Sequence, residues 1–534
     1  MALMTEPFTR KAKEAQRKFF NKMQRMGMAI AAHDEYWVCS RGTGKSEGLD
    51  ARFIIRNVWS MPGSTGALIS PSYAKAWGNT LPAIIHALAE WGYIEGIHFF
   101  VGRRAPLSAN FGKPKRPPLQ TAWSNCIHFW NGTVLVVLSF SQGMSANSMS
   151  LDWVIGPEAK FLDYDKIKSE VDPANRGNLQ DFNQCPWHHS VLYSTDMPTL
   201  KAGRWILDKI NDMNPVHINL IRNLYREMKL TERLPEQTPY TQRKYKELRH
   251  DLMLARKYQA PVKPMRGKTR EYTVYYGEYD IFDNMEVVGK DYIWQMYRNV
   301  PSLIWRTAFM NERLFRVANG FYSALNDYHF YTPGDTRYMG SMGADWNRLR
   351  LAGCLADGDL DMDAPLLIGF DSNSAINTAC IGQVQGHQLR TLKSFFVKTP
   401  DKLDELARQV CEYYKYKLKR DIIFFYDQTF TWTTGNNSES YQDTIIRIFK
   451  EYGWDITDIY IGQVSRHDWR HEQIDRALKH DPALLYPVFN KYNNEFLKLA
   501  MEQTAVKVGK NGFEKDKSPE ATEDLSLIHI SEPT

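Results

Sequence analysis

Short apolar runs alternate with helical patterns along the first half of the chain. The expected strands are 35–39, 66–70, 126–130, 133–140, 151–156 and 190–194, and the expected helices are 45–60, 73–91 and 200–213. Strand–helix alternation with apolar, β-branched strands predicts a parallel α/β sheet. The fold class expected for the first half is therefore α/β with a parallel central sheet.

A second α/β pattern follows a stretch that lacks periodicity. Its expected strands are 366–371, 376–383, 389–397 and 421–427, and its expected helices are 401–418 and 440–452. We therefore expect a first domain over 1–335, with a charged helical and linker region over 215–335, then a linker over 336–365 and a second domain over 366–524. The last residues, 525–534, read "LSLIHISEPT" and resemble translated adapter sequence, so we expect the second domain to be truncated.

The composition sets broad limits on function. The formal net charge of +6 fits an anionic partner such as DNA without requiring one. No apolar stretch is long enough to cross a membrane, so no membrane partner is expected. The six cysteines form no C-x-x-C pair, which favours a reducing compartment without disulfides.

The stretch "CSRGTGKS" at 39–46 follows the first apolar run and ends like a phosphate-binding loop. The usual pattern starts with glycine, and here Cys39 stands in that place. In such a loop, backbone N–H groups at a helix start bind anionic oxygens, a lysine neutralises the phosphates and a hydroxyl ligates Mg²⁺. The alternative is a glycine-rich turn after a strand. The predicted ATP-binding residues are Arg41, Gly42, Thr43, Gly44, Lys45 and Ser46, with Ser46 also a metal ligand.

Two later strand ends carry polar residues that suit the same site. In "LDWVIGPEAK" an apolar strand leads to Glu158, the candidate for a carboxylate that holds Mg²⁺ or polarises the attacking water. The alternative is an ordinary helix start at Pro157 and Glu158. In "YSTDMP" the hydroxyls of Ser194 and Thr195 are placed to sense the γ-phosphate, although the same residues also form plain turns.

Two aspartates close apolar strands in the second half. Asp371 ends "LLIGFD" and Asp427 ends "DIIFFYD". If the two strands are parallel neighbours, both carboxylates lie at one sheet edge. Two carboxylates in one place repel each other unless cations bridge them, which is the arrangement of a two-metal nuclease. For either residue alone, a turn or helix cap is the simpler explanation.

The ordered set of motifs resembles the large terminase subunits of tailed bacteriophages. The matching stretches are "SRGTGKS", "DWVIGPEAKFLD", "LYSTDMP", "IGFDSNSAINTACIG", "FFYD" and "EKDKSPE". Within the family, "EAKFLD" is most similar to the crAss-like gut phage group. The resemblance implies a P-loop ATPase domain that translocates DNA and a ribonuclease-H-like nuclease domain that cuts it.

The resemblance also implies roles for single residues. Lys45 and Ser46 would bind phosphate and Mg²⁺, and Glu158 would be the catalytic glutamate. Ser194 and Thr195 fall in the motif that couples hydrolysis to movement. The first two nuclease acids correspond to two aspartates that follow apolar strands, Asp371 and Asp427.

The sequence departs from the family pattern in two places. Pro157 stands where the family usually has an aspartate beside the catalytic glutamate, and proline cannot help to hold Mg²⁺. The third nuclease acid normally follows the "KDKS" segment, where this chain meets the suspected adapter. Asp516, Glu520 and Asp524 are the stand-ins, with Asp524 taken as the third metal ligand, although we expect the true third acid to be missing.

Partners and cofactors follow from the same resemblance. It implies ATP and Mg²⁺, with Mn²⁺ as an alternative in the nuclease site. The implied partners are double-stranded DNA, a portal protein, a small terminase subunit and further copies of the chain in a homo-oligomer on the portal. The implied location is the host cell cytoplasm and, transiently, the procapsid rather than the mature virion.

Two other functions remain open on sequence grounds. One is a P-loop helicase or repair ATPase fused to a nuclease. The other is a catalytically inactive DNA-binding or capsid-interaction protein, which Pro157 and the missing acid favour. Two groups of basic residues are candidates for contacts with DNA phosphates, with solvated loops as the commoner explanation. They are Arg103, Arg104, Lys113, Lys115 and Arg116, and Lys257, Lys263, Arg266, Lys268 and Arg270.

Overall fold

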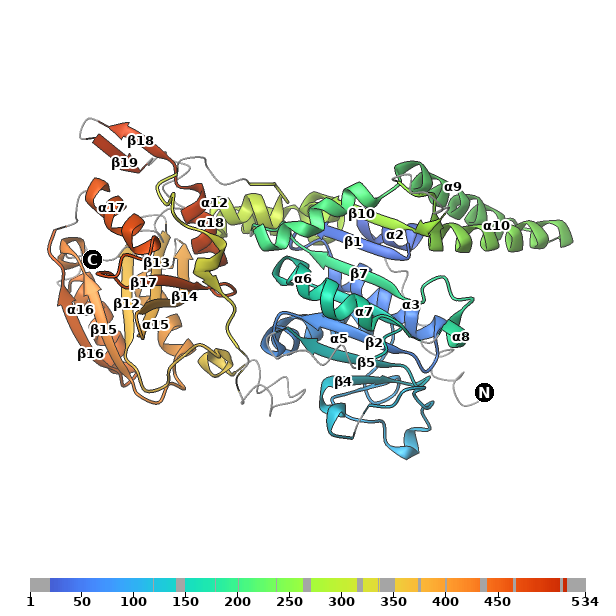
Figure 1. The fold of residues 1–534 in the computed structure, drawn as a ribbon, viewed down its shortest axis with the longest axis horizontal. Helices are drawn as coiled ribbons and strands as arrows, with labels where there is room; N and C mark the ends of the chain where they lie inside the picture. Colours follow the sequence, from blue (N-terminus) through green and yellow to red (C-terminus); the bar gives the residue numbers. More distant parts are fainter. Residues whose placement is uncertain are drawn as a thin grey trace. The chain divides into compact units, whose positions relative to one another are not determined.

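The computed structural model contains two compact units (Figure 1). It describes residues 20–118, 120–140, 149–177, 179–199, 201–236, 238–262, 270–314, 320–334, 336, 351–372, 376–398, 401–432, 439–463, 467–509 and 512–515. The first unit comprises Met1–Ile293, Ala308–Asn311 and Gly343–Trp346, and the second comprises Trp294–Thr307, Glu312–Met342 and Asn347–Thr534. By these contacts the main segment of the first unit ends at Ile293, whereas the predicted first domain extends to residue 335. The functional domain bounds remain a prediction.

The first unit is built on a sheet with strand order β10-β1-β7-β6-β2-β5-β4-β3. In that order the strands are Val274–Tyr279, Asp34–Cys39, Ser190–Thr195, Trp153–Pro157, Thr65–Ser70, Val134–Ser139, Cys126–Phe129 and Phe99–Val101. Neighbouring strands are parallel from β10 to β5 and antiparallel from β5 to β3. Parallel strands place their carboxyl ends at one edge of the sheet, where ligands of open α/β sheets bind.

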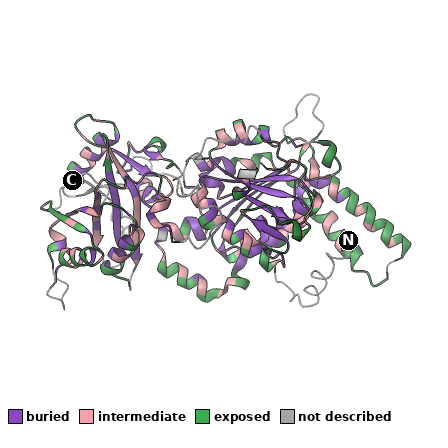
Figure 2. Cartoon of the chain, turned by 90° about the horizontal axis from the view of Figure 1, so that it is seen from below, coloured by how far each residue is buried: buried purple, intermediate pink, exposed green. Residues whose placement is uncertain are grey.

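Helices cover both faces of this sheet, because its strands are apolar on both sides. The longer helices of this unit are α2 (Lys22–Ile30), α3 (Arg52–Ser60), α5 (Leu81–Glu90), α9 (Pro215–Glu232) and α10 (Pro239–Lys257), and α11 (Met285–Asn299), interrupted at Gly289, begins in it. One face of the sheet packs against Ile167, Trp205 and Ile206 in a continuous core. On the other face, the Phe53 ring of α3 packs edge-on against Trp153 of β6. Figure 2 shows the strands buried and the long helices partly exposed.

The second unit is built on a mixed sheet with strand order β11-β17-β14-β13-β12-β15-β16. In that order the strands are Phe330–Tyr331, Tyr486–Asn490, Gln388–Lys398, Ile376–Gln385, Leu366–Ser372, Asp421–Tyr426 and Asp455–Tyr460. β13 is antiparallel to both β12 and β14, while β15 is parallel to β12 and to β16. The sheet therefore combines an antiparallel meander with parallel strands that need helical crossovers.

Two apolar cores lie on the two faces of the second sheet. One core contains residues of α15 (Leu403–Tyr413) and α16 (Tyr441–Glu451). The other contains residues of α17 (His467–Leu478) and α18 (Glu495–Gln503). α15 and α16 carry apolar residues at the helical spacing expected for a buried face, for example Leu403, Leu406, Ala407 and Val410.

The predicted strands are present in the structure in every case, within one or two residues of the expected bounds. The α/β fold class and the parallel central sheet of the first unit are confirmed. The sequence analysis missed β3 and β10 at the two edges of the first sheet, and β11, β16 and β17 in the second. None of the helices within the described residues is long and apolar enough to cross a bilayer.

Candidate functional site

The glycine-rich loop connects β1 to the helix that begins at Ser46, as the sequence predicts. Gly42 and Gly44 have φ values of +79° and +78°. These values lie in the left-handed region, where side chains with a Cβ are strained. The loop therefore needs glycine at both positions, whereas Cys39, in place of the usual first glycine, is a buried residue at the end of β1.

The loop forms one wall of a cavity of about 560 Å³. The other walls are α5, through Ala83, His86, Ala87 and Glu90, and Glu158 beyond β6. All six predicted ATP-binding residues, from Arg41 to Ser46, line this cavity. Lys45 and Glu158 are more than 100 residues apart in sequence, and the parallel sheet brings them to the same cavity.

Two cations of the loop are held by groups at the carboxyl ends of strands. The Nζ atom of Lys45 donates to the backbone oxygen of Cys39 at 2.6 Å. The Nε atom of Arg41 lies 3.4 Å from the Oδ2 atom of Asp196, and the Arg41 side chain is about half exposed. Both positive side chains therefore stay beside the cavity.

Glu158 follows directly after Pro157, the last residue of β6. Its φ and ψ of 55° and 41° place it in the left-handed region, which a non-glycine residue occupies at a cost. Pro157 pairs with Ser194 in the parallel register of β6 and β7. The proline side chain has no atom that could bind a metal ion, so Glu158 supplies the carboxylate of this turn.

The end of β7 contacts both walls of the site. The Ser194 hydroxyl donates to the Oδ1 atom of Asp50 at 2.9 Å, and Asp50 lies on the helix that follows the loop. The Thr195 hydroxyl accepts from the backbone N–H of Lys160 at 3.3 Å, just beyond Glu158. The predicted coupling residues thus connect the loop helix to the turn that carries the candidate catalytic glutamate.

Two buried carboxylates in this region have opposite pKa shifts. Burial raises the pKa of Asp50 to about 7, although the Ser194 hydrogen bond and Lys45 act against the shift. Burial alone would raise the pKa of Asp196, but Lys160, Lys45 and Arg41 hold it below its ordinary value. Asp196 is therefore a buried anion, paired with the buried Nζ atom of Lys160 at 2.6 Å.

Sequence reasoning missed Asp50 and Lys160 as members of this site. Asp50 lies four residues after Ser46, in a helical stretch where a polar residue normally faces solvent, yet it is 3% exposed. Lys160 is likewise 3% exposed. Both are charged residues in mostly apolar surroundings, Asp50 on the helix after the loop and Lys160 in the short turn Ala159–Phe161.

Of the two predicted nuclease aspartates, Asp371 lies on β12, and Asp427 directly follows the neighbouring parallel strand β15. The register of β12 and β15 pairs Leu367 with Ile423 and Gly369 with Phe425. The pairing of the two strands ends there, two residues before Asp371 and Asp427. The two aspartates therefore lie at the carboxyl ends of neighbouring parallel strands, and their joint role as metal ligands stays a prediction.

Asp427 also begins a short helical turn, Gln428–Thr431. Its Oδ1 atom accepts from the backbone N–H of Thr429 at 2.8 Å, so the cap predicted as the simpler explanation is present too. A cap leaves carboxylate lone pairs free for a cation. Two carboxylates at one edge suit divalent-cation binding, with oxygen ligands of the kind Mg²⁺ prefers. Within the described part of the chain, no cluster of three metal-ligating side chains is present. Asp516, Glu520 and Asp524 lie outside the described residues.

Three of the basic residues suggested for DNA contacts are bound within the first unit. Lys115 pairs with Asp181 at 2.6 Å, and Arg116 pairs with the fully buried Asp152 at 2.8 Å. Lys257 donates to backbone oxygens of Asn183 and Cys185. These contacts favour a structural role for the three residues. The positions 263, 266 and 268 lie outside the described residues.

Similarity between this chain and known proteins is found in structure alone. No protein-family model matches the chain, and no curated protein matches it. Over 96% of this chain and 99% of that chain, it is similar to the large terminase of the thermophilic bacteriophage D6E, with 8% identity and a TM-score of 0.34. It is also similar to the ATPase domain of the Thermus phage P74-26 large terminase, with 12% identity, a TM-score of 0.30, and 54% of this chain and 93% of that chain covered. A third similar structure is the large terminase nuclease of the thermophilic phage G20c, with 8% identity, a TM-score of 0.20, and 31% of this chain and 80% of that chain covered.

Proposed function

We propose that this chain is a viral terminase large subunit. In this proposal the first unit hydrolyses ATP to move double-stranded DNA into a procapsid, and the second unit cuts concatemeric DNA. One observation carries the proposal: Lys45, Ser46 and Glu158 line one cavity at the carboxyl ends of parallel strands. Asp371 and Asp427, at the carboxyl ends of the neighbouring parallel strands β12 and β15, support a second centre of suitable chemistry.

In the first unit, the loop N–H groups and Lys45 bind the phosphates of ATP. Ser46 is the residue that would hold Mg²⁺, which neutralises charge on the phosphate oxygens. Glu158 orients the attacking water and accepts its proton. Arg41 lies beside the cavity and is positioned to leave Asp196 for the terminal phosphate. Ser194 and Thr195 then connect the state of the site to the rest of the unit, through Asp50 and Lys160.

In the second unit, Asp371 and Asp427 are the residues that would hold Mg²⁺ or Mn²⁺. Such ions activate water and stabilise the charge that develops on a phosphodiester during cleavage. Asp371 belongs to β12 and Asp427 caps the turn that follows β15, so the sheet and the cap together position the two residues. Asp524 is proposed as a third ligand from the sequence resemblance alone.

Double-stranded DNA, a portal protein, a small terminase subunit and further copies of the chain are the proposed partners. A motor of this kind holds the DNA backbone without reading the bases. The proposed location is the host cytoplasm and the procapsid during packaging. The proposed domain bounds are 1–335 for the motor and 366–524 for the nuclease.

A second candidate function is a catalytically inactive DNA-binding or capsid-interaction protein. Pro157 favours it, because the position before Glu158 carries no second carboxylate. The two candidates differ in a single measurable property, the turnover of ATP.

The test measures ATP hydrolysis by the purified chain with and without linear duplex DNA. The motor predicts turnover in the wild type and a loss on the order of 10²–10⁴-fold in Glu158→Gln, which removes the base but retains the shape. Lys45→Ala should abolish binding of ATP as well as its turnover. Glu90→Gln is the matched control, since Glu90 lines the same cavity on α5 and has no proposed catalytic role. Absence of wild-type turnover, with DNA binding retained, would select the inactive protein.

A further inference from the structure

Every backbone carbonyl from Cys39 to Gly44 accepts a hydrogen bond. The first three bonds come from inside the loop. The Nζ atom of Lys45 donates to the Cys39 oxygen at 2.6 Å, and the Thr43 hydroxyl donates to the Ser40 oxygen at 2.8 Å. The Ser40 hydroxyl donates to the Arg41 oxygen at 3.3 Å. The donors of these three bonds belong to the motif itself, so the sequence pattern already contains them.

The next three carbonyls are bound by side-chain amides from outside the motif. Asn284 donates through Nδ2 to the Gly42 oxygen at 2.6 Å. Asn21 donates through Nδ2 to the Thr43 oxygen at 2.8 Å. Gln24 donates through Nε2 to the Gly44 oxygen at 3.4 Å, and that oxygen also accepts from the Gly48 backbone N–H at 2.9 Å. We call Asn21, Gln24 and Asn284 the amide cradle. These three side chains are 2%, 4% and 5% exposed, so they make these contacts away from water.

The amides of the cradle fix one another's orientation. Asn21 caps α2 by accepting from the Gln24 N–H at 2.8 Å, and the Gln24 side chain accepts from the Asn21 N–H at 3.1 Å. The Nδ2 atom of Asn21 also donates to the Oδ1 atom of Asn284 at 2.6 Å. Each amide therefore has its oxygen occupied by a donor, and its nitrogen can face the loop in one orientation only.

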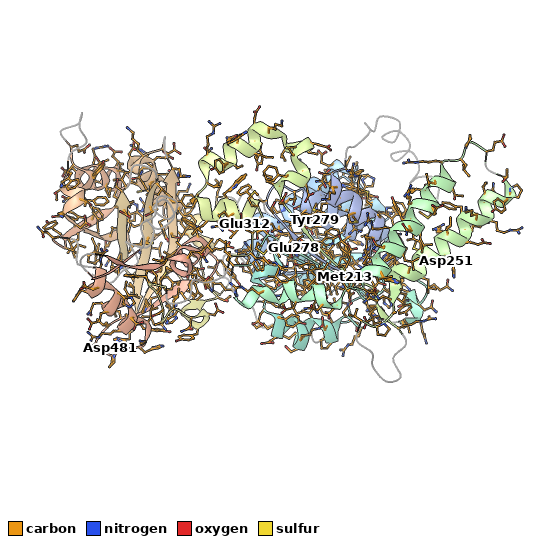
Figure 3. The ribbon with its side chains drawn as sticks, turned by 90° about the horizontal axis from the view of Figure 1, so that it is seen from above. Met213, Asp251, Glu278, Tyr279, Glu312 and Asp481 are labelled. Atoms are coloured by element: carbon orange, nitrogen blue, oxygen red, sulfur yellow. The ribbon has the colours of Figure 1, made fainter. Side chains whose placement is uncertain are left out.

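The cradle comes from two distant segments of the chain. Asn21 and Gln24 belong to the start of α2, whereas Asn284 ends the turn Ile281–Asn284. That turn follows β10, the strand on which Glu278 and Tyr279 lie (Figure 3). The backbone N–H of Ser40 donates to the Tyr279 oxygen at 2.9 Å, so β10 and its turn lie along the loop from its first residue.

Glycines allow the cradle to approach this closely. A Cβ atom at Gly44 would lie 2.8 Å from the Nε2 atom of Gln24, and one at Gly48 would lie 2.1 Å from the Cγ atom of Gln24. Gly48, the second glycine of "GKSEG", therefore makes room for the Gln24 side chain, a requirement that the phosphate-loop pattern does not include.

The hydrogen bonds determine which way the loop N–H groups point. In a trans peptide the C=O and N–H groups point in opposite directions. With the carbonyls of Gly42 and Thr43 turned to the cradle, the N–H groups of the following residues point away from it. Successive N–H groups around left-handed residues form a concave anion-binding nest. The lining of the cavity by the same loop residues agrees with this orientation.

We infer that Asn21, Gln24 and Asn284 are positioning residues for the phosphates of the nucleotide. They hold the loop in its anion-binding conformation before the ligand arrives, and none of them needs to touch the ligand. This inference rests on the proposed nucleotide site. It names residues outside the motif that set the affinity of that site for phosphate groups.

The test uses Asn21→Ser in the full chain. Serine is as good a helix cap as asparagine and adds no charge, so α2 keeps its start while the loop loses its donor. The control is Asn214→Ser, because Asn214 caps α9 in the same unit by accepting from the His217 N–H at 3.1 Å. Calorimetry measures the affinity for ADP and for pyrophosphate, and the thermal midpoint of each ligand-free variant is recorded beside it.

Asn21→Ser should weaken binding of both ligands by about tenfold. The loss of one hydrogen bond to a buried carbonyl costs a free energy that corresponds to about a tenfold change in affinity. Asn214→Ser should bind both ligands as the wild type does. Asn284→Ala, which removes the donor to Gly42, provides the same measurement if Asn21→Ser does not fold. Wild-type affinity in the folded cradle variants would overturn the inference and leave the proposed function intact. A wild-type chain that binds neither ligand would overturn both.

Discussion

The two candidate sites are built in different ways, and the nucleotide site depends far more on its surroundings than the acid site does. In the first unit, charged groups around the cavity are held by buried partners, such as Lys160 with Asp196 and Ser194 with Asp50. In the second unit, the two aspartates lie at the carboxyl ends of neighbouring parallel strands, and Asp427 accepts from Thr429 in a local cap.

This difference indicates how substitutions should affect each site. A site made from a loop has to be held in shape by contacts from several elements, because the loop backbone has no ladder of its own. A site made from strand ends takes its geometry from the sheet, which is stable without the functional side chains. Substitutions in the first site should therefore change stability as well as activity, whereas substitutions in the second should change activity alone.

The largest effect is expected for Asp196→Asn. This change leaves the buried ammonium of Lys160 without its charged partner, and breaking one half of a buried ion pair costs about 3–5 kcal/mol. Chemical denaturation followed by tryptophan fluorescence should show this loss of free energy of unfolding. The control is Asp172→Asn, which breaks the exposed pair between Lys168 and Asp172 and should cost no more than about 0.5 kcal/mol. Equal losses of unfolding free energy in the two variants would contradict the stabilisation of the first site by buried charges.

A smaller effect, confined to activity, is expected for Asp427→Asn. Metal-dependent DNA cleavage should fall at least about 100-fold, because a metal ligand worth several kcal/mol of transition-state stabilisation is lost. The free energy of unfolding should change by less than about 0.5 kcal/mol, since asparagine still accepts from the Thr429 N–H.

Asp458→Asn provides the comparison for that variant. Asp458 lies on the next strand, β16, where it accepts from Gln442 at 2.8 Å and pairs in register with Phe424 rather than with an acid. Its substitution should leave cleavage unchanged. A large loss of stability in Asp427→Asn would show that the second site, too, is part of the structural framework.

The smallest effect is expected from the pH dependence of Asp50→Asn. The pKa of Asp50 is raised by burial from 3.8 to about 7. Between these values the unfolded chain has lost the proton that the folded chain keeps, so wild-type stability falls as pH rises and then levels off above about pH 7. An asparagine at this position does not titrate, so the variant should gain about 2–3 kcal/mol relative to the wild type between about pH 5 and 7.

Urea unfolding of both proteins at several pH values measures this difference. Ser194→Ala sharpens the test, because the Ser194 hydrogen bond lowers the pKa of Asp50. Without that bond, the fall in stability should continue to higher pH. Parallel pH profiles of stability for the wild type and Asp50→Asn would contradict a raised pKa of the buried Asp50 carboxyl.

Much of the fold was predictable from local pattern. The strands from 35–39 to 190–194 and from 366–371 to 421–427 are apolar runs of strand length, and each appears in the structure where the sequence predicts it. β10 was missed because its sequence, "VYYGEY", carries a glycine and a glutamate in a strand that has only one neighbour. β16 was missed because it is mostly exposed at the other sheet's edge and lacks an apolar face.

The candidate sites were predictable in part. The loop, Glu158, Ser194, Thr195 and the two aspartates follow strands, and parallel topology places strand ends together. Asp50 and Lys160 were not predictable, because their burial depends on which helix covers which strand end. The roles assigned to these residues remain predictions until the substitutions above are measured.

The sequence by itself determined the local elements: which runs form strands, where the glycines permit left-handed turns, and which polar residues end each strand. These features depend on side-chain periodicity and backbone preference within a few residues. Only the tertiary structure decided that Asn284 reaches the loop beside Asn21, and that the strand carrying Asp371 is the parallel neighbour of the strand leading to Asp427. Those placements depend on strand order and register, which are set by the packing of segments tens to hundreds of residues apart.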